Sequence, residues 1–350
     1  PWHPSFFEMM TAIAFAYFAR ERAEIAVLEV GMGGRLDATN VVEPLVSVIA
    51  DISLDHQKFL GNTVGEITRE KVGIIRPRGV VVTLPQQPEA NDVIGNTILE
   101  LGAKGVSAVE FVPPVSPGSG DYLVSSLDQA PSLTAKGAEE DAKHAEKNFQ
   151  PLSRYPLQLM GKEILVESSL VGRHQLRNIA LAVGAAEALS KMSFEQITPE
   201  SVERGIRQTR WPGRFQVLPV RTGWPEIVFD VAHNPAGAWA LRAALSEHYD
   251  NRPLIFVFAA MRDKAISEMT EILFPLADRV IATRPENPRS ASPEEIQQAG
   301  RRTGARIEAI AEIGTALNRA RVVAAPDTVI VVTGSIYLVG EAMRLLGVRT

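Results

Sequence analysis

The sequence predicts an α/β protein built from two domains with parallel sheets. Short apolar runs alternate along the chain with segments that carry helix-capping signals or apolar residues at helical spacing. The chain has 350 residues, and at about 100–200 residues per domain this length fits two domains, each able to bury its own core. Hydrophobic residues make up 45% and charged residues 22%, which are ordinary proportions for a globular protein.

The first expected elements are a helix and a strand. Ser5 and Glu8 have the spacing of a capping box, and the apolar run that follows to Phe18 predicts a helix. Because this helix is apolar nearly all round, we expect it to be buried. Residues 24–30 (EIAVLEV) predict a buried strand that ends in the Gly-rich turn 31–34.

Two further strands are expected in the first half of the chain. Residues 45–52 predict an apolar strand that ends in Ser-Leu-Asp-His at 53–56. A capping box between Thr63 and Glu66 opens a helix that carries Lys71. Residues 79–84 predict the next strand. Helices that alternate with short apolar strands are typical of a parallel sheet.

The middle of the chain predicts an insertion followed by two helices. Composition favours a surface insertion over about 113–150, partly disordered and with one solvated helix. From His174 apolar residues return at helical spacing, and Thr198-Pro199 opens a shorter helix. Residues 211–214 (WPGR) break the pattern. We therefore expect one domain at 1–210 and a second at 214–350.

The second domain is predicted to be small and Rossmann-like. Its strands are expected at 227–230, 254–259, 279–283 and 328–333. Its helices are expected to begin near Pro235, Ala265, Pro293, Glu312 and Ser335. In such a sheet the functional loops lie at the carboxyl ends of the strands.

Charge and composition exclude several classes of protein. With 36 Lys+Arg and 41 Asp+Glu the formal net charge is −5, and the pI of about 5.8 argues against a nucleic-acid-coating protein. The chain has no cysteine, which excludes thiol nucleophiles and Cys-based zinc sites and fits a reducing compartment such as the cytoplasm. The first apolar stretch is too short to span a membrane.

Glu29 and His56 are candidate ligands for a divalent cation. Both are expected near the carboxyl ends of neighbouring strands, and a carboxylate there is costly to bury unless it binds a cation or accepts strong hydrogen bonds. Mg²⁺ takes one or two protein ligands together with waters and phosphates. The alternative is that Glu29 pairs with Arg35 and that His56 is an ordinary loop residue. The turn 31–34 lacks the third glycine of a dinucleotide fingerprint, so we reject that interpretation.

Three other positions have both a functional and a structural interpretation. Lys71 is expected at the same sheet edge as Glu29 and His56, which is the functional interpretation. The structural alternative is a solvated lysine that forms a pair on a helix face. Asp230 ends a predicted strand, and in the functional interpretation it accepts hydrogen bonds from ribose hydroxyls while His233 meets an anion. The alternative is that Asp230 or Asn234 only caps the next helix. Ser335 opens a helix whose N–H groups suit an anion, or is a plain cap.

Eight short motifs follow one another along the chain: 5–8 (SFFE), 29–40 (EVGMGGRLDATN), 53–56 (SLDH), 70–75 (EKVGII), 172–178 (GRHQLRN), 211–214 (WPGR), 230–235 (DVAHNP) and 334–337 (GSIY). In this order they resemble the motifs of the folylpolyglutamate synthase/dihydrofolate synthase family of Mur-ligase-like enzymes. The resemblance implies a P-loop-type ATPase domain with a parallel sheet followed by a Rossmann-like glutamate ligase domain. It also implies ATP-dependent addition of L-glutamate to dihydropteroate or folates through an acyl phosphate, in folate biosynthesis.

The resemblance implies roles for individual residues. Glu29 and His56 match Mg²⁺ ligands, and Lys71 matches a lysine that is carbamylated in the family. The nucleotide-contacting positions match Asn178, Arg214 and Asp230. The pterin-substrate loop matches Leu36, Asp37 and Ala38. The glutamate tail and the acyl phosphate are expected to approach His233 and Ser335. A cytoplasmic monomer that binds small molecules, and neither nucleic acid nor membrane, is expected.

One departure from the family pattern concerns the phosphate loop. Gly-x-x-x-x-Gly-Lys-[Ser/Thr] does not occur in the 350 residues. We therefore expect the chain to be truncated at its N-terminus and inactive by itself. A sister peptidoglycan-precursor ligase and a non-catalytic nucleotide-binding remnant are the alternatives to the predicted function.

Overall fold

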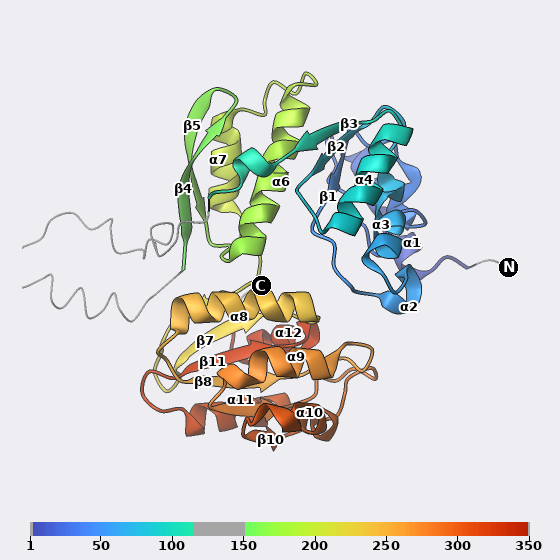
Figure 1. The fold of residues 1–350 in the computed structure, drawn as a ribbon. Coiled ribbons are helices and arrows are strands. Elements are labelled where there is room, and N and C mark those ends of the chain that lie inside the picture. The colour runs from blue at the N-terminus through green and yellow to red at the C-terminus, as the bar shows by residue number, and fades with distance from the viewer. Residues whose placement is uncertain (1–2, 115–150, 349–350) are drawn as a thin grey trace, which may run out of the picture. The chain divides into compact units, whose positions relative to one another are not determined.

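The computed structural model describes residues 3–114 and 151–348. By its packing the chain divides into two units that are interleaved along the sequence (Figure 1). The first unit comprises Pro1–Val112, Leu159–Gly161 and Arg177–Val202, and the second comprises Pro113–Gln158, Lys162–Leu176 and Glu203–Thr350. The expected insertion falls almost wholly on 115–150, outside the described residues.

The first unit contains a parallel sheet of three strands among the described residues, in the order β1-β2-β3. These are β1 (Val46–Ile49), β2 (Val80–Thr83) and β3 (Lys104–Ser107). The helices are α1 (Phe6–Arg20), α2 (Gln57–Leu60), α3 (Val64–Lys71), α4 (Pro88–Glu100) and most of α6 (Arg173–Ser190), with a 3₁₀ turn η1 (Ala38–Val41). Ile67, Val81 and Ile94 are among the buried residues that hold α3 and α4 on the sheet.

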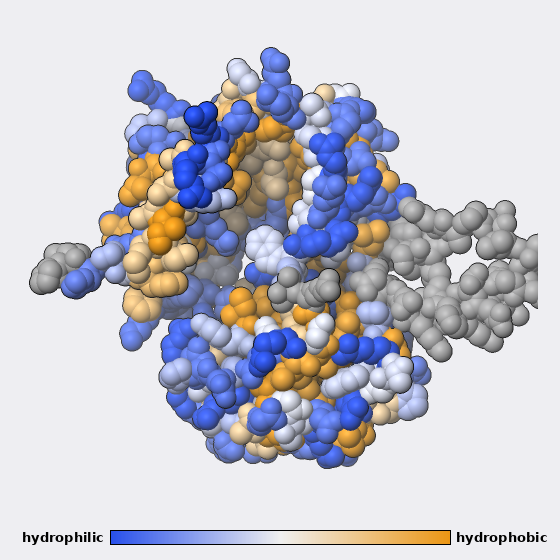
Figure 2. Space-filling model, turned by 180° about the vertical axis from the view of Figure 1, so that it is seen from behind, coloured by the Kyte–Doolittle hydropathy of each residue, from blue (hydrophilic) through white to orange (hydrophobic). Residues whose placement is uncertain are grey.

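Two predictions for this unit are wrong. Residues 24–30 form no strand in the described structure, and Val27 is 93% exposed. An apolar run becomes a strand only when a neighbouring strand completes its hydrogen bonds, and nothing pairs with this run in the part of the chain that the structure describes. Helix α1 does form, with the expected capping box, but it has no buried residue. Figure 2 shows hydrophobic side chains at the surface of the first unit.

The second unit contains a sheet of six strands in the described residues, in the order β10-β9-β8-β11-β7-β6. All neighbours are parallel except β6, which is antiparallel to β7. The strands are β6 (Gln216–Leu218), β7 (Glu226–Asp230), β8 (Leu254–Phe258), β9 (Arg279–Ala282), β10 (Ile307–Ala309) and β11 (Val329–Thr333). The four predicted strands are confirmed, whereas β6 and β10 were not predicted.

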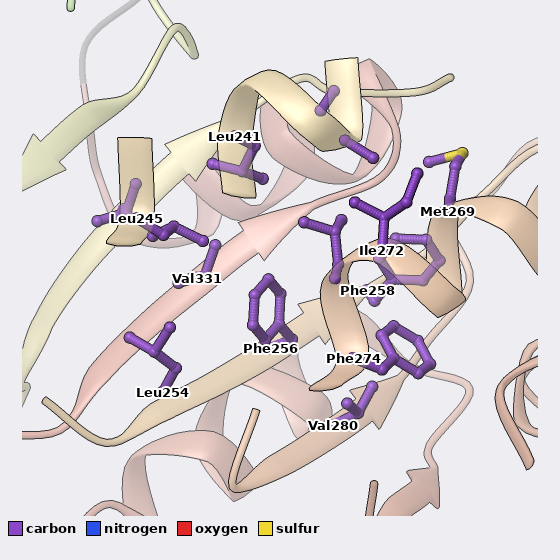
Figure 3. Packing of buried hydrophobic residues seen from close by; sticks show 14 of the residues in the cluster. Leu241, Leu245, Leu254, Phe256, Phe258, Met269, Ile272, Phe274, Val280 and Val331 are labelled. Atoms are coloured by element: carbon purple, nitrogen blue, oxygen red, sulfur yellow. The ribbon is translucent and has the colours of Figure 1, made fainter. Parts of the chain in front are cut away.

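Helices cover both faces of this sheet, as in a Rossmann-like fold. One face packs on α8 (Pro235–Tyr249), α9 (Ile266–Leu273) and α10 (Pro293–Gly300), and the other on α11 (Ile313–Val323) and α12 (Ile336–Leu345). Figure 3 shows Phe256 and Phe258 of β8 lying between Leu241 of α8 and Phe274. A hairpin of β4 (Ser153–Leu159) and β5 (Lys162–Ser168) and helix α7 (Pro199–Gln208) complete the described chain.

Candidate functional site

The Gly-rich turn after residue 30 is organised by Asp37. One carboxylate oxygen of Asp37 accepts hydrogen bonds from the backbone N–H groups of Gly31 (3.0 Å) and Met32 (3.1 Å). The other accepts from the N–H (2.9 Å) and hydroxyl (2.6 Å) of Thr39. Partial burial alone would raise the pKa of Asp37, but these hydrogen bonds lower it overall, so the carboxylate stays charged. Asp37 therefore shapes its own loop.

The same turn is fixed to the end of helix α3. The Arg35 N–H donates to the Glu70 carbonyl (2.8 Å), and the Arg35 guanidinium pairs with the Glu70 carboxylate (3.0 Å). A Cβ at Gly34 would lie 2.8 Å from the carbonyl oxygen of Lys71, so only glycine permits this approach. The interpretation that Arg35 pairs with Glu29 is wrong, because Glu70 takes that place.

Lys71 is the last residue of α3 and is partly buried. Burial lowers the pKa of its amine, and the neighbouring Asp55 carboxylate opposes this by favouring the charged form. A solvated surface lysine would not show such a depression. The structure thus brings Lys71, the loop of Asp55 and the Gly-rich turn into one local assembly.

His56 has a left-handed backbone conformation (φ 51°) at the start of α2. Such a conformation costs a residue other than glycine on the order of 1 kcal/mol and is concentrated at functional sites. Its Nε2 lies 4.0 Å from an Asp55 carboxylate oxygen, and its side chain is 42% exposed. Leu60, at the other end of α2, lies against Gly33 of the turn, which places α2 beside the Gly-rich turn.

Glu29 lies in the exposed segment that precedes the turn. Among the described residues no cluster of three or more His, Cys, Asp or Glu side chains has the geometry of a metal site, and no hydrogen bond or ion pair of the described chain joins Glu29 to His56. The donor types still fit Mg²⁺, since an exposed carboxylate and the Asp55–His56 pair leave room for waters and phosphate oxygens.

In the second unit, Asp230 ends β7 in a buried position. Its two oxygens accept hydrogen bonds from the N–H groups of Ala232 (2.8 Å) and Phe215 (3.0 Å). Burial raises its pKa to about 6, against the opposing effect of these N–H groups and of the Arg214 charge. Asp230 thus connects the turn at 211–214 to the carboxyl end of β7.

His233 and Asn234 follow at the same sheet edge. The His233 Nδ1 lies 2.9 Å from the Val231 carbonyl, and because a carbonyl only accepts, Nδ1 is the donor in this hydrogen bond. The Asn234 side chain accepts from the Gly237 N–H (2.8 Å) and caps α8. The capping alternative is therefore confirmed for Asn234, whereas Asp230 does not cap this helix.

Ser335 caps α12 by accepting from the Tyr337 N–H (3.2 Å). The preceding Gly334 has φ 99°, and a Cβ there would lie 2.3 Å from the Ala259 carbonyl oxygen. Thr333 and Asp230 are paired in neighbouring parallel strands. His233 and Ser335 therefore follow the carboxyl ends of adjacent strands, at one edge of the sheet.

The remaining predicted residues are exposed or partly exposed. Asn178 lies on an exposed position of α6, Leu36 is 80% exposed, and Ala38 begins η1. Sequence reasoning missed Asp55 as a neighbour of Lys71, although it was part of the quoted SLDH motif. It also missed the pairing of Arg177 with Asp51. These two residues are 126 positions apart, so no local sequence pattern indicates their contact.

The comparisons with known proteins agree on one family. The sequence model described as "Mur ligase, glutamate ligase domain" matches residues 213–336. The chain is 32% identical over 297 residues to the dihydrofolate synthase/folylpolyglutamate synthase of Bacillus subtilis, covering 85% of this chain and 62% of that protein. It is 32% identical over 361 residues to the protein of the same name from Mycobacterium tuberculosis, covering 97% of this chain and 68% of that protein.

A solved structure supports the fold over the same range. The folylpolyglutamate synthase of Mycobacterium tuberculosis, complexed with ADP and AMPPCP, superposes with a TM-score of 0.78 at 31% identity. That superposition covers 99% of this chain and 74% of the solved one. The chain thus spans less than two thirds of the Bacillus relative and about two thirds of the Mycobacterium relative. In the described residues no helix is long and apolar enough to cross a membrane.

Proposed function

Because this chain belongs to the folylpolyglutamate synthase/dihydrofolate synthase family, we propose that it takes part in ATP-dependent ligation of L-glutamate to dihydropteroate, to (poly)glutamyl folates or to both. The observation that carries the proposal is the local assembly around Lys71. A lysine with a depressed pKa, a carboxylate–imidazole pair and a rigid Gly-rich turn meet there. Such a set suits a phosphoryl-transfer site.

We propose that the two parts of the sequence have different roles in the reaction. Residues 1–210 are assigned to ATP binding, with an insertion at about 113–150, and residues 214–350 to the glutamate ligase domain. The match of residues 213–336 to a glutamate ligase domain supports the second assignment. We also propose that the protein works as a cytoplasmic monomer on small molecules.

The proposed reaction has two steps. A substrate carboxylate attacks the γ-phosphorus of ATP, which forms an acyl phosphate and releases ADP. The neutral amine of glutamate then attacks the acyl carbon, which forms the amide and releases phosphate and a proton. Because an acyl phosphate hydrolyses readily, the site must exclude water between the two steps.

Glu29 and His56 are the proposed ligands of Mg²⁺, which when bound neutralises charge on the phosphate oxygens. Lys71 is proposed to react as a neutral amine with dissolved CO₂, giving a carbamate and a proton. Its lowered pKa favours this reaction, since only the neutral amine has a free electron pair. The carbamate would supply a carboxylate near Asp55 that could help to hold the cation and the phosphate groups in place.

ATP is proposed to contact Asn178, Arg214 and Asp230. With a pKa of about 6 Asp230 is mostly ionised at pH 7, and each of its oxygens keeps a lone pair beyond its backbone hydrogen bond for a ribose hydroxyl. Arg214 contributes a positive charge beside this carboxylate.

The substrate contacts are proposed for both units. The exposed Leu36 offers apolar surface to a pterin ring, whereas Asp37, whose oxygens are engaged within its loop, and Ala38 fix the shape of that loop. His233, which follows the carboxyl end of β7, is proposed to lie where the incoming glutamate approaches. Ser335 opens a helix whose first N–H groups suit an anionic group.

An assay of the full-length gene product that contains this sequence tests the proposal. Purified protein receives MgATP and radiolabelled L-glutamate with dihydropteroate, with tetrahydrofolate or with a uridine-linked muramyl substrate. We expect labelled amide and stoichiometric ADP with one or both pteridine substrates and none with the muramyl substrate. Amide formation with the muramyl substrate alone would favour the sister ligase. ATP binding without amide formation would favour the non-catalytic alternative.

A further inference from the structure

One arginine connects a helix of the first unit to two strand ends. Arg177 of α6 donates two hydrogen bonds to the Asp51 carboxylate, from Nε to one oxygen (2.6 Å) and from Nη2 to the other (2.5 Å). Nη2 also donates to the Pro85 carbonyl (2.9 Å). Asp51 follows β1 and Pro85 follows β2, so a single guanidinium holds the carboxyl ends of two neighbouring strands.

The loop that begins at Asp51 is fixed from a second side. Gln86 accepts from the Ile52 N–H (3.0 Å) and donates to the Ala50 carbonyl (3.2 Å). The residues on either side of Asp51 are therefore bound by one side chain while Asp51 itself is bound by another. Asp55 and His56 follow this fixed start of the loop within five residues.

Helix α6 also has a fixed distance from the sheet. A Cβ at Gly184 would lie 3.0 Å from the side chain of Val82 and 3.2 Å from that of Ala108, so the helix lies as close to β2 as a glycine permits. Packing at Gly184 limits the approach of the helix, and Arg177 fixes its N-terminal half. Asn178, the proposed nucleotide contact, is the next residue.

We infer that Arg177 and Asp51 form a positioning pair that sets the place of Asn178 relative to the Asp55–His56 loop, and so aligns a nucleoside triphosphate with its divalent cation. The inference rests on the proposed function. A solvated ion pair would not be expected to make three hydrogen bonds, and an arginine is required because only its planar fork binds a carboxylate through two parallel N–H groups. The Arg177 side chain is only 23% exposed.

The test compares Arg177→Met, Arg177→Lys and Asp51→Asn in the full-length gene product. We expect KM for MgATP to rise about tenfold for Arg177→Met and Asp51→Asn and about threefold for Arg177→Lys, which keeps the charge but loses the fork. KM for glutamate should stay within about twofold. Because the two residues act together, the double variant Asp51→Asn/Arg177→Met should be no worse than the poorer single variant.

Lys191→Met is the matched control. Lys191 directly follows the last residue of α6 and pairs with Glu187 of that helix (2.8 Å), about 20 Å along the helix axis from Arg177. Its loss should leave KM for MgATP unchanged. The melting temperature is measured for every variant, so that a loss of folded protein is separated from a loss of affinity. The inference is overturned if KM stays within twofold in all Arg177 and Asp51 variants, if the two effects add, or if Lys191→Met has the same effect.

Direct titration of MgATP separates this inference from the proposed function. If the parent protein binds MgATP but forms no amide, the proposed ligase function fails, and the inference is judged on the dissociation constants alone. A tenfold weaker Kd in Arg177→Met, with the control unchanged, then supports it. A parent protein that does not bind MgATP overturns both.

Discussion

The three-stranded sheet of the first unit and the six-stranded sheet of the second differ in how completely they are covered. Every residue of β7, β8 and β11 in the second unit is buried, whereas β1 has one exposed position and β3 is mostly exposed. The candidate residues follow the same division. Asp230 and Ser335 are buried at the ends of buried strands, whereas Glu29 and His56 lie on exposed loops. In the first unit, substitutions at the site should therefore separate activity from stability, and in the second they should not.

The largest expected effect is on the stability of the covered sheet. Phe258 is fully buried and lies edge-on to Phe274 at 5.2 Å between ring centroids. Phe258→Ala should lower the free energy of unfolding by about 3–5 kcal/mol, because it leaves a cavity in a packed core. The described tryptophans, Trp211, Trp224 and Trp239, belong to the second unit, so denaturant unfolding followed by tryptophan fluorescence measures this loss.

Val27→Ala is the matched substitution in the first unit. Because Val27 is 93% exposed, its truncation should change the free energy of unfolding by no more than about 0.5 kcal/mol. Denaturant unfolding and the melting temperature both measure this change. A loss comparable with that of Phe258→Ala would show that residues 24–30 are packed in solution, and the contrast between the two sheets would fail.

The next effect is on the metal-dependent step. His56→Ala and Glu29→Ala should each reduce ligation by the full-length gene product on the order of 10³-fold, since a bound cation contributes several kcal/mol to phosphoryl transfer. Because both residues are exposed, the melting temperature should hardly change. Mg²⁺ titration of the ligation rate is the measurement, with His3→Ala and Glu24→Ala as exposed controls. Wild-type rates and Mg²⁺ dependence in both variants would contradict the assignment.

Lys71→Ala should reduce ligation about 100-fold, because it removes the proposed carbamate. Added short carboxylates should restore part of the rate, since they replace the missing negative charge. Under ¹³CO₂ the parent protein should show a carbamate carbon signal that Lys71→Ala lacks and the exposed-lysine control Lys104→Ala retains. A parent protein that is active without this signal would refute the carbamate while leaving the lysine itself in the site.

The contrast between the sheets also explains what the sequence could predict. Buried strands such as β7 and β11 contain uninterrupted apolar runs and were predicted nearly to the residue. Residues 24–30 are a run of the same kind, yet they form no described strand, because pairing depends on a neighbour that the run itself does not specify. The roles of the candidate residues came from the family resemblance. The Arg177–Asp51 pair joins distant positions, which no local pattern encodes.

Asp230 should make the stability of the second unit depend on pH. Its folded-state pKa of about 6 lies above the ordinary 3.8, so the folded state binds the proton more tightly than the unfolded state does. The contribution of this carboxyl to the free energy of unfolding, up to roughly 3 kcal/mol, is fully present below about pH 4. It is lost as the pH rises to about 6. Asp230→Asn cannot titrate, so its stability relative to the parent should increase over that interval. Parallel pH profiles of unfolding for the two proteins would contradict the burial of this carboxyl.

The smallest expected effect concerns Asn234, and it distinguishes a residue that only caps α8 from one that also contacts substrate. Asn234 accepts from the Gly237 N–H and so satisfies one of the first amides of α8. Asn234→Ala should cost about 1 kcal/mol, whereas Asn234→Ser keeps an acceptor oxygen and should cost much less. Hydrogen exchange at the Gly237 amide and fluorescence-monitored unfolding measure the difference. If Asn234 only caps the helix, Asn234→Ser restores ligation together with stability. If ligation stays low while stability returns, the amide itself contacts substrate, and the site at the end of β7 extends one residue beyond His233.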